Sequence, residues 1–469
     1  MEKNIVALVD FGSTFTKVVL VEAGNGSLLA ASKAPTTVET DVIYGYKDAL
    51  SSACSSLPFE PTTMTKLAAS SAGGGLSVAA IGLVEDYTAR AARQAALNAG
   101  AKVEIVLTGR LDITSINALN RLRPDILLFS GGTDGGQTRQ VIDNAKMLTN
   151  CCFEVPIIVA CNSEIAGNVA DILGKQFYNV EITENVLPEI DTMNIEPARS
   201  IINKIFIEQV IIGKGLSQSK EFSQAVIMPT PEAVLIAIGL LSKGTTFTGG
   251  VGDLLAVDIG GATTDVHSAI DRFDLNHGIS MHGLQYPPLS RSVQGDLGMR
   301  WSASSTFNAD ANWLVSESRK RQLHQDTMKK GCQQRNSKPH FLARDETNQW
   351  IDEMLAVSCT TLSLERHCGS MRAVYIQNQG VDLVQEGINC RNVPLLIGTG
   401  GMLAYDAKGE ATLKTALARQ TNEVLSPESP DVVIDRKYIL GAAGILSTID
   451  PQAAFNLMKS ELIAEAPMA

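Results

Sequence analysis

The hydrophobic and polar positions of the first forty residues have the spacing of short strands. Residues 5–9, 16–21 and 27–31 are apolar runs, and the sequence Gly24-Asn25-Gly26 separates the last two. Asn-Gly steps between short apolar runs are typical of β-hairpins. This part of the chain therefore predicts a β-meander.

From about residue 67 the pattern alternates between short apolar runs and amphipathic stretches. Residues 85–100 predict a helix, because the stretch is rich in alanine, carries its charges on one side and ends at Gly100. Strands are then expected at 103–107, 125–129 and 155–160, and helices at 112–123 and 137–148. Such alternation predicts a doubly wound α/β unit. The polar stretch 213–223 has the composition of a linker and ends this unit.

The length of 469 residues exceeds what one hydrophobic core normally organises, so several domains are expected. The predicted division is an N-terminal part at 1–66, an inserted α/β domain at 67–223 and a remainder at 224–469. With 45% hydrophobic residues the chain can form well-packed cores.

The charge balance argues against polyanionic partners. Lys and Arg number 39 and Asp and Glu number 50, so the overall field repels nucleic acid and anionic membranes. The apolar runs are too short for a signal sequence or a membrane span. The 8 cysteines contain no Cys-x-x-Cys pair, which fits a reduced cytoplasmic location without zinc or iron–sulfur sites.

Two distant segments share one pattern. Asp10 follows the apolar run 5–9, Asp258 follows the apolar run 254–257, and glycines and hydroxyl residues come after each acid. Glycines let main-chain N–H groups approach an anion, to which hydroxyls can also donate. We call residues 10–17 the first turn and residues 258–265 the second turn. Their repetition predicts that both turns bind phosphate.

The order of three motifs resembles one superfamily. The first turn, the second turn and a third turn, residues 398–401 after a buried strand, occur in the order seen in the ATPase fold shared by actin, hexokinase and heat-shock chaperones. The resemblance implies an α/β protein with two duplicated, ribonuclease-H-like lobes that clamp ATP, and with the doubly wound domain inserted.

The resemblance also assigns roles to residues. Asp10 and Asp258 would hold hydrated Mg²⁺, and Glu232, at the start of a connecting helix, would orient the attacking water, so Glu232 and Asp258 are the catalytic candidates. The residues expected at the nucleotide are Asp10, Gly12, Ser13, Thr14, Lys17, Gly260, Gly261, Thr263, Thr264, Gly398, Thr399, Gly400 and Gly401. For Lys17, exposure to solvent on a strand is an equal alternative.

A finer resemblance extends over essentially the whole chain. Residues 9–17, the stretch 71–84, the loop 130–136 and residues 257–265 are similar to the accessory-protein family of glutamate mutase (methylaspartate mutase). The resemblance implies a chaperone-like reactivating factor, with slow Mg²⁺-dependent ATP hydrolysis, that exchanges damaged cobalamin in an adenosylcobalamin-dependent enzyme. The mutase subunits would be its partners, and a homo-oligomer is left open.

The inserted unit resembles, in its order of elements, the flavodoxin-like cobalamin-binding domain of the mutases. It lacks the Asp-x-His-x-x-Gly motif of that domain, and none of the 6 histidines falls within it. The expectation is that the insert mimics or displaces the mutase domain without binding cobalt.

Several alternatives stay open. The chain could be a small-molecule kinase of the same fold, an actin-like scaffold, or an activator of a radical enzyme, although the scattered cysteines argue against the last. The glycine loop at 130–136 is either a tight turn or a contact for a ligand or partner. The basic segment 316–348 predicts a solvated helix pair, with an adenine- or partner-facing lobe as the alternative.

Overall fold

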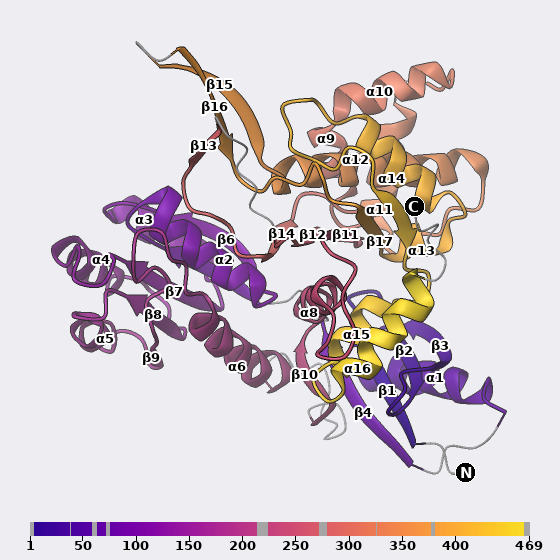
Figure 1. Cartoon of the computed structure of the whole chain (residues 1–469), viewed down its shortest axis with the longest axis horizontal. Helices are drawn as coiled ribbons and strands as arrows, with labels where there is room; N and C mark the ends of the chain where they lie inside the picture. Colours follow the sequence, from indigo (N-terminus) through magenta and orange to yellow (C-terminus); the bar gives the residue numbers. More distant parts are fainter. Residues whose placement is uncertain are drawn as a thin grey trace. The chain divides into compact units, whose positions relative to one another are not determined.

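The computed structural model describes residues 4–37, 39–58, 63–71, 76–212, 224–271, 279–324, 326–376 and 380–463. The expected linker at 213–223 and most of the stretch 71–75 lie outside these ranges. The chain forms two compact units (Figure 1). The first unit comprises Met1–Ala72, Ala233–His282 and Arg291–Ala469, and the second comprises Gly73–Glu232 and Gly283–Ser290.

The first sheet of the first unit begins with the expected meander. Four of its five strands are β1 (Asn4–Phe11), β2 (Phe15–Glu22), β3 (Leu28–Pro35) and β4 (Thr63–Ser70). They occur in the order β4-β1-β2-β3, with antiparallel β1/β2 and β2/β3 pairs and a parallel β1/β4 pair. Leu67 pairs with Leu8, so residues 67–70 belong to this sheet. Helix α1 (Val42–Ser55) packs on β2 and β3 and is capped by Asp41, which accepts from the Ile43 N–H.

The second sheet of this unit repeats the arrangement. Its strands are β11 (Leu254–Ile259), β12 (Thr264–Ala269), β14 (Leu289–Gln294), β17 (Leu395–Thr399) and β18 (Asp431–Ile434), in the order β14-β12-β11-β17-β18. Strand β11 pairs antiparallel with β12 and parallel with β17, as β1 does with β2 and β4. The duplicated sheet confirms the expected α/β, actin-like fold class.

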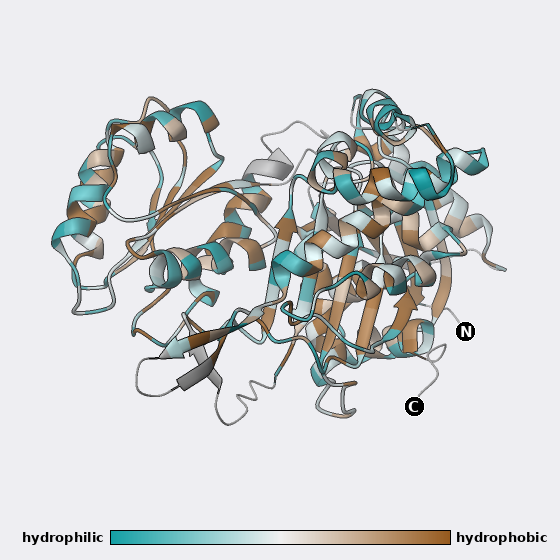
Figure 2. Cartoon of the chain, turned by 90° about the horizontal axis from the view of Figure 1, so that it is seen from above, coloured by the Kyte–Doolittle hydropathy of each residue, from teal (hydrophilic) through white to brown (hydrophobic). Residues whose placement is uncertain are grey.

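Helices pack on both large sheets of the first unit, and the unit also has a small third sheet. The helices of this part of the chain are α8 (Thr230–Lys243), α9 (Ala303–Ala309), α10 (Ala311–Lys320), α11 (Thr327–Ser337), α12 (Glu346–His367), α13 (Gly401–Tyr405), α14 (Gly409–Ala418), α15 (Ile439–Leu446), α16 (Pro451–Met458) and the π-helical η3 (Lys459–Ile463). The third sheet has the order β13-β16-β15, from β13 (Ile279–His282), β15 (Ser370–Ile376) and β16 (Gly380–Glu386). Strands of the large sheets are mostly hydrophobic in Figure 2, as buried strands require.

The basic segment 316–348 is only partly solvated. It forms the expected helix pair, with parts of α10 and α11, but the side chain of Arg335 is fully buried. Arg335 Nε donates to Asp352 Oδ1 at 2.7 Å, and Arg335 Nη2 donates to the carbonyl of Asn348 at 2.7 Å. The solvated interpretation is therefore wrong at this arginine, because its charge is compensated inside the protein.

The second unit is a parallel sheet with helices. Its strands are β5 (Ser77–Ile81), β6 (Lys102–Leu107), β7 (Ile126–Gly131), β8 (Ile157–Cys161) and β9 (Val180–Ile182). The order β6-β5-β7-β8-β9 with parallel pairs is the flavodoxin-like doubly wound order. The other elements are the π-helical η2 (Glu85–Ala89), α2 (Arg90–Asn98), α3 (Ile113–Leu122), α4 (Arg139–Leu148), α5 (Ala166–Leu173), α6 (Glu196–Ile212) and β10 (Val226–Pro229).

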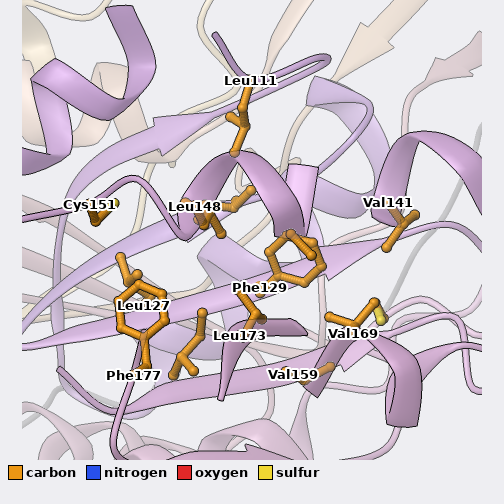
Figure 3. Packing of buried hydrophobic residues seen from close by; sticks show 14 of the residues in the cluster. Leu111, Leu127, Phe129, Val141, Leu148, Cys151, Val159, Val169, Leu173 and Phe177 are labelled. Atoms are coloured by element: carbon orange, nitrogen blue, oxygen red, sulfur yellow. The ribbon is translucent and has the colours of Figure 1, made fainter. Parts of the chain in front are cut away.

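The core of the second unit explains why its sequence pattern was readable. Leu127 and Phe129 of β7 and Val159 of β8 pack against Leu148 of α4 and Leu173 of α5 (Figure 3). Residues 126 and 128 of β7 are buried as well, so the strand is apolar on both faces, as in parallel sheets. Across the described residues of both units, no helix is long and apolar enough to cross a membrane.

Candidate functional site

The first turn is a tight connection between β1 and β2. The Gly12 N–H donates to the Phe15 carbonyl at 3.2 Å, and a Cβ on Gly12 would lie only 2.7 Å from that oxygen. Asp10 pairs with Lys17 across the hairpin, and Lys17 Nζ donates to Asp10 Oδ2 at 2.8 Å. Lys17 is therefore held at the turn by a carboxylate, and it is not the solvent-exposed strand lysine of the alternative interpretation.

The second turn has the same construction with different charges. The Gly260 N–H donates to the Thr263 carbonyl at 2.8 Å, and Asp258 pairs with Asp265 across the hairpin. Asp265 takes the place that Lys17 has in the first turn. Its carboxylate accepts from Arg291 Nη2 at 2.6 Å and from Thr263 Oγ1 at 3.3 Å.

Neighbouring segments hold the carbonyl groups of both turns. The Thr14 carbonyl accepts from the Thr36 N–H at 2.9 Å, and the Gly261 carbonyl accepts from the Arg300 N–H at 2.8 Å. In the part of the chain that the structure describes, the N–H groups of Ser13, Thr14 and Gly261 donate to no protein acceptor. Both turns thus present main-chain donors, which is the requirement for an anion site.

The two turns lie next to each other. A Cβ on Gly261 would be 3.8 Å from Thr14 Oγ1, although 247 residues separate the two positions in the sequence (261 minus 14). Both positions belong to the first unit. The structure therefore brings the predicted donors Ser13, Thr14 and Gly261 to one place.

Acidic side chains surround Lys17. Burial disfavours its charge, but the carboxylates of Asp10, Asp258 and Asp435 outweigh this effect and raise the pKa of Lys17. The lysine stays charged and neutralises an otherwise repulsive group of acids. A polyphosphate that enters would find this cation and the N–H donors together.

Asp258 is the most perturbed acid of the second turn. Burial raises its pKa to about 6, and the nearby carboxylates of Asp265, Asp10 and Asp435 add to the shift while Lys17 opposes it. A shift of this kind, from desolvation combined with specific charges, is common at functional sites. Asp258 can therefore change its charge near neutral pH.

The third turn touches the second. Thr399 pairs with Asp258 in the sheet, and Gly400 has a φ of 100° with its Cβ position only 2.3 Å from the Ile259 carbonyl. Only glycine fits there. A Cβ on Gly401 would lie 3.9 Å from the hydroxyl of Tyr438.

One predicted contact, that of the Thr264 hydroxyl, needs correction, and Gly398 packs closely against the core. The Thr264 hydroxyl is buried and donates to the Leu297 carbonyl at 3.0 Å, so it is not directed to the exposed side of the turn. A Cβ on Gly398 would lie 2.6 Å from a Leu413 methyl group. Gly398 thus permits close packing in the core. Both residues lie inside strands, where neighbouring side chains alternate between faces.

Glu232 lies near the start of α8, within the second unit. Its side chain is buried and accepts from Asn203 Nδ2 at 2.6 Å. Burial raises the pKa of Glu232, while Arg199 and Asn203 oppose the shift. A raised pKa makes this carboxylate a better proton acceptor than an ordinary glutamate. Its role toward water stays a prediction.

Sequence reasoning missed Asp435 and Tyr438. Asp435 follows β18, is fully buried, and accepts from the N–H groups of Ile439 and Leu440 at 2.8 and 3.0 Å. The Tyr438 ring lies under Lys17 Nζ, 4.2 Å from its centroid. Asp435 comes directly after the short strand β18, as Asp10 and Asp258 come at the ends of theirs, and this pattern could have indicated it. No local pattern indicates Tyr438.

The chemistry of the acids fits a magnesium ion. Mg²⁺ usually takes one or two protein carboxylates and completes its shell with water and phosphate oxygens. Asp10 and Asp258, which both interact with Lys17, supply two such carboxylates. Among the described residues, no group of three or more His, Cys, Asp or Glu side chains could hold a metal by itself.

The strand order and the turns first define a class: an α/β protein of the actin-like fold, with two hairpin turns that offer N–H donors at one place. The family follows from the sequence. The protein-family model described as MutL protein matches residues 6–462 of this chain. The chain therefore belongs to this family. Protein MutL of Clostridium tetanomorphum is 39% identical over 464 residues, which are 97% of this chain and 98% of that protein.

Solved structures show weaker likenesses. The ethanolamine utilization protein EutJ from Carboxydothermus hydrogenoformans is 10% identical, with 96% of this chain and 90% of that chain covered and a TM-score of 0.32. A ligand-bound xylulose kinase from Lactobacillus acidophilus is 10% identical, with 99% and 93% covered and a TM-score of 0.35. The fold assignment rests on the strand order and not on these values.

Proposed function

We propose that this protein is an ATP-dependent reactivating factor for adenosylcobalamin-dependent glutamate mutase. In this role it hydrolyses ATP slowly with Mg²⁺ and uses the nucleotide state to change its affinity for the mutase subunits, so that damaged cobalamin is exchanged. Membership of the MutL protein family and the resemblance in the sequence support the client. The geometry of the turns supports the nucleotide.

The observation on which the nucleotide proposal depends is the meeting of the two turns. Thr14 and Gly261 come from different hairpins, lie within contact distance, and carry N–H groups without a protein acceptor among the described residues. Donors from two sides can hold a phosphate chain, and hydrolysis of ATP depends mainly on such positioning and on charge neutralisation.

The remaining residues fit into this scheme. Lys17 supplies a cation for the phosphates, Asp10 and the ionised form of Asp258 hold Mg²⁺, and Mg²⁺ neutralises charge that develops on the phosphates. Gly401 leaves room for the adenosine, and Gly400 lets the third turn pass close to β11. The assignment of Glu232 to the attacking water rests on the sequence resemblance alone.

The second unit is the proposed contact for the mutase. Its parallel sheet has the flavodoxin-like order. The loop at residues 132–136 is stabilised by hydrogen bonds from a neighbouring segment. Asn185 Nδ2 donates to the Gly132 carbonyl at 3.0 Å and to Asp134 Oδ1 at 2.9 Å. These bonds favour the tight-turn interpretation of that loop. In the proposal the unit displaces the mutase's own cobalamin domain and binds no cobalt.

Recovery of an inactivated client tests the function. Glutamate mutase inactivated by oxygen is incubated with this protein, ATP, Mg²⁺ and fresh adenosylcobalamin, and mutase activity is followed. Recovery is expected only when all components are present. The Asp258→Ala variant should give no recovery while its circular dichroism matches that of the wild type. Full recovery without ATP, or with Asp258→Ala, would refute the proposal.

A further inference from the structure

Tyr438 has an unusual backbone. Its φ is 59° and its ψ is 40°, a left-handed conformation that few residues other than glycine adopt. Among the described residues, only Arg123 and Gln322 share a positive φ without being glycine. Such a conformation costs free energy and persists where the surroundings impose it, often at ligand sites.

Asp435 imposes this conformation. Its buried carboxylate accepts from the N–H groups of Ile439 and Leu440, which fixes the first turn of α15 directly after Tyr438. The Asp435 N–H in turn donates to the Gly398 carbonyl at 2.8 Å. The tyrosine is thereby anchored to the strand that ends in the third turn.

The ring of Tyr438 lies next to residues of the first and third turns. Lys17 Nζ stands 4.2 Å from the ring centroid, and a Cβ on Gly401 would lie 3.9 Å from the hydroxyl. On its other side, Tyr405 packs against Tyr438 with ring centroids 6.0 Å apart. Lys33, which pairs with Lys17 across β2 and β3, lies 3.2 Å from the centroid of the Tyr405 ring. Two lysines of the first sheet thus rest on two tyrosines that follow the second sheet.

We propose that Tyr438 is a positioning residue that holds the Lys17 ammonium beside Asp10 for the phosphate chain of a nucleoside di- or triphosphate. A cation over an aromatic face is attracted most strongly where water is excluded. The Tyr438 ring lies against one side of the Lys17 ammonium, and the Asp10 carboxylate accepts a hydrogen bond from it. The other N–H groups of the ammonium can then donate to phosphate oxygens. This inference rests on the proposed nucleotide site and adds a residue to it.

Three variants separate the ring from the backbone. Tyr438→Gly removes the ring. Because glycine adopts the left-handed conformation without strain, this substitution introduces no new backbone strain in the folded state. Tyr438→Phe keeps the ring and removes the hydroxyl. Arg123→Gly releases the same kind of strain at a φ of 49° in the second unit and serves as the matched control.

Calorimetry of ATP, ADP and adenosine with the full chain tests the role. Tyr438→Gly should lose roughly tenfold more affinity for ATP and ADP than it loses for adenosine. Tyr438→Phe and Arg123→Gly should match the wild type for all three. Equal ATP affinity in Tyr438→Gly and wild type would overturn the proposal. So would an equal loss for adenosine, or a loss in Tyr438→Phe as large as in Tyr438→Gly.

A second readout needs no nucleotide. An amine-reactive reagent, with the modified lysines quantified by mass spectrometry, should label Lys17 several times faster in Tyr438→Gly than in the wild type, while exposed Lys175 is labelled equally. An unchanged Lys17 rate would contradict the positioning role. If the wild type bound no ATP at all, the proposed function would fail, and the labelling rates would still decide whether Tyr438 holds Lys17.

Discussion

The first and second turns have the same backbone hydrogen bond but carry opposite charges at the residue that pairs with the leading acid. Each closes with a glycine N–H that donates to the carbonyl three residues on, and each pairs its leading acid with the residue seven positions later. That residue is Lys17 in the first turn and Asp265 in the second. The first turn therefore contains its own cation, while the second turn obtains one from Arg291.

The two turns share a backbone conformation and differ in the cation that pairs with their acids. Lys17 neutralises the acids at the turns and stays within reach of an anion. Arg291 is only 3% exposed and pairs with Asp265 inside the protein, while burial is the main cause that raises the pKa of Asp258 to about 6. Each turn thus contributes one acid and main-chain N–H donors, and only the first contributes a lysine, which stays paired with Asp10.

The largest expected effect comes from removing the carboxylate that Arg291 binds. Asp265→Asn leaves a buried guanidinium charge without its carboxylate, which should lower the free energy of unfolding by about 3–5 kcal/mol. Urea unfolding measures this loss. The control is Asp296→Asn, whose ion pair with Arg366 is exposed and should cost about 1 kcal/mol or less. Equal losses in the two variants would show that the second turn does not depend on its buried pair.

The next effect is the pH dependence of Asp258. Its pKa is raised in the folded protein from 3.8 to about 6. The folded state therefore binds the proton more tightly, and the wild type should lose stability as the pH rises through 6. Relative to Asp258→Asn, the loss between pH 4 and pH 8 should be about 2 kcal/mol. Urea unfolding across this range tests it, and a difference that does not change with pH would contradict it.

A smaller effect separates the two glycines. A Cβ on Gly12 would lie 2.7 Å from a backbone oxygen, against 3.0 Å for Gly260. Gly12→Ala must therefore shift the first turn and should cost about 1–3 kcal/mol, whereas Gly260→Ala should cost about 1 kcal/mol or less. Thermal and urea unfolding of the two variants measure the costs. A larger cost at Gly260 would mean that the second turn is the more rigid.

Much of the fold was readable from local patterns. The meander, the alternating elements of the second unit and the two turns follow from periodicity of apolar residues, glycines and caps, such as Asp112 before α3. The parallel pairing of β4 with β1 was not readable, because strand partners are set by long-range packing.

The candidate site was predictable only as separate pieces. Glycines and acids after apolar strands indicated the three turns. The approach of Thr14 to Gly261 and of Lys17 to Tyr438 joins segments hundreds of residues apart, which no spacing in the sequence encodes. The Thr264 hydroxyl was misassigned because the motif does not say which face of a strand a side chain occupies.

Calorimetric titration of ATP with Mg²⁺ into Thr14→Ala, Gly261→Ala and the double variant tests most directly whether the two turns form one site. We predict one site per chain, weaker binding in each single variant, and a double variant whose loss differs from the sum of the single losses, because residues in contact do not act independently. The absence of ATP binding to the wild type, or strictly additive losses, would contradict this account.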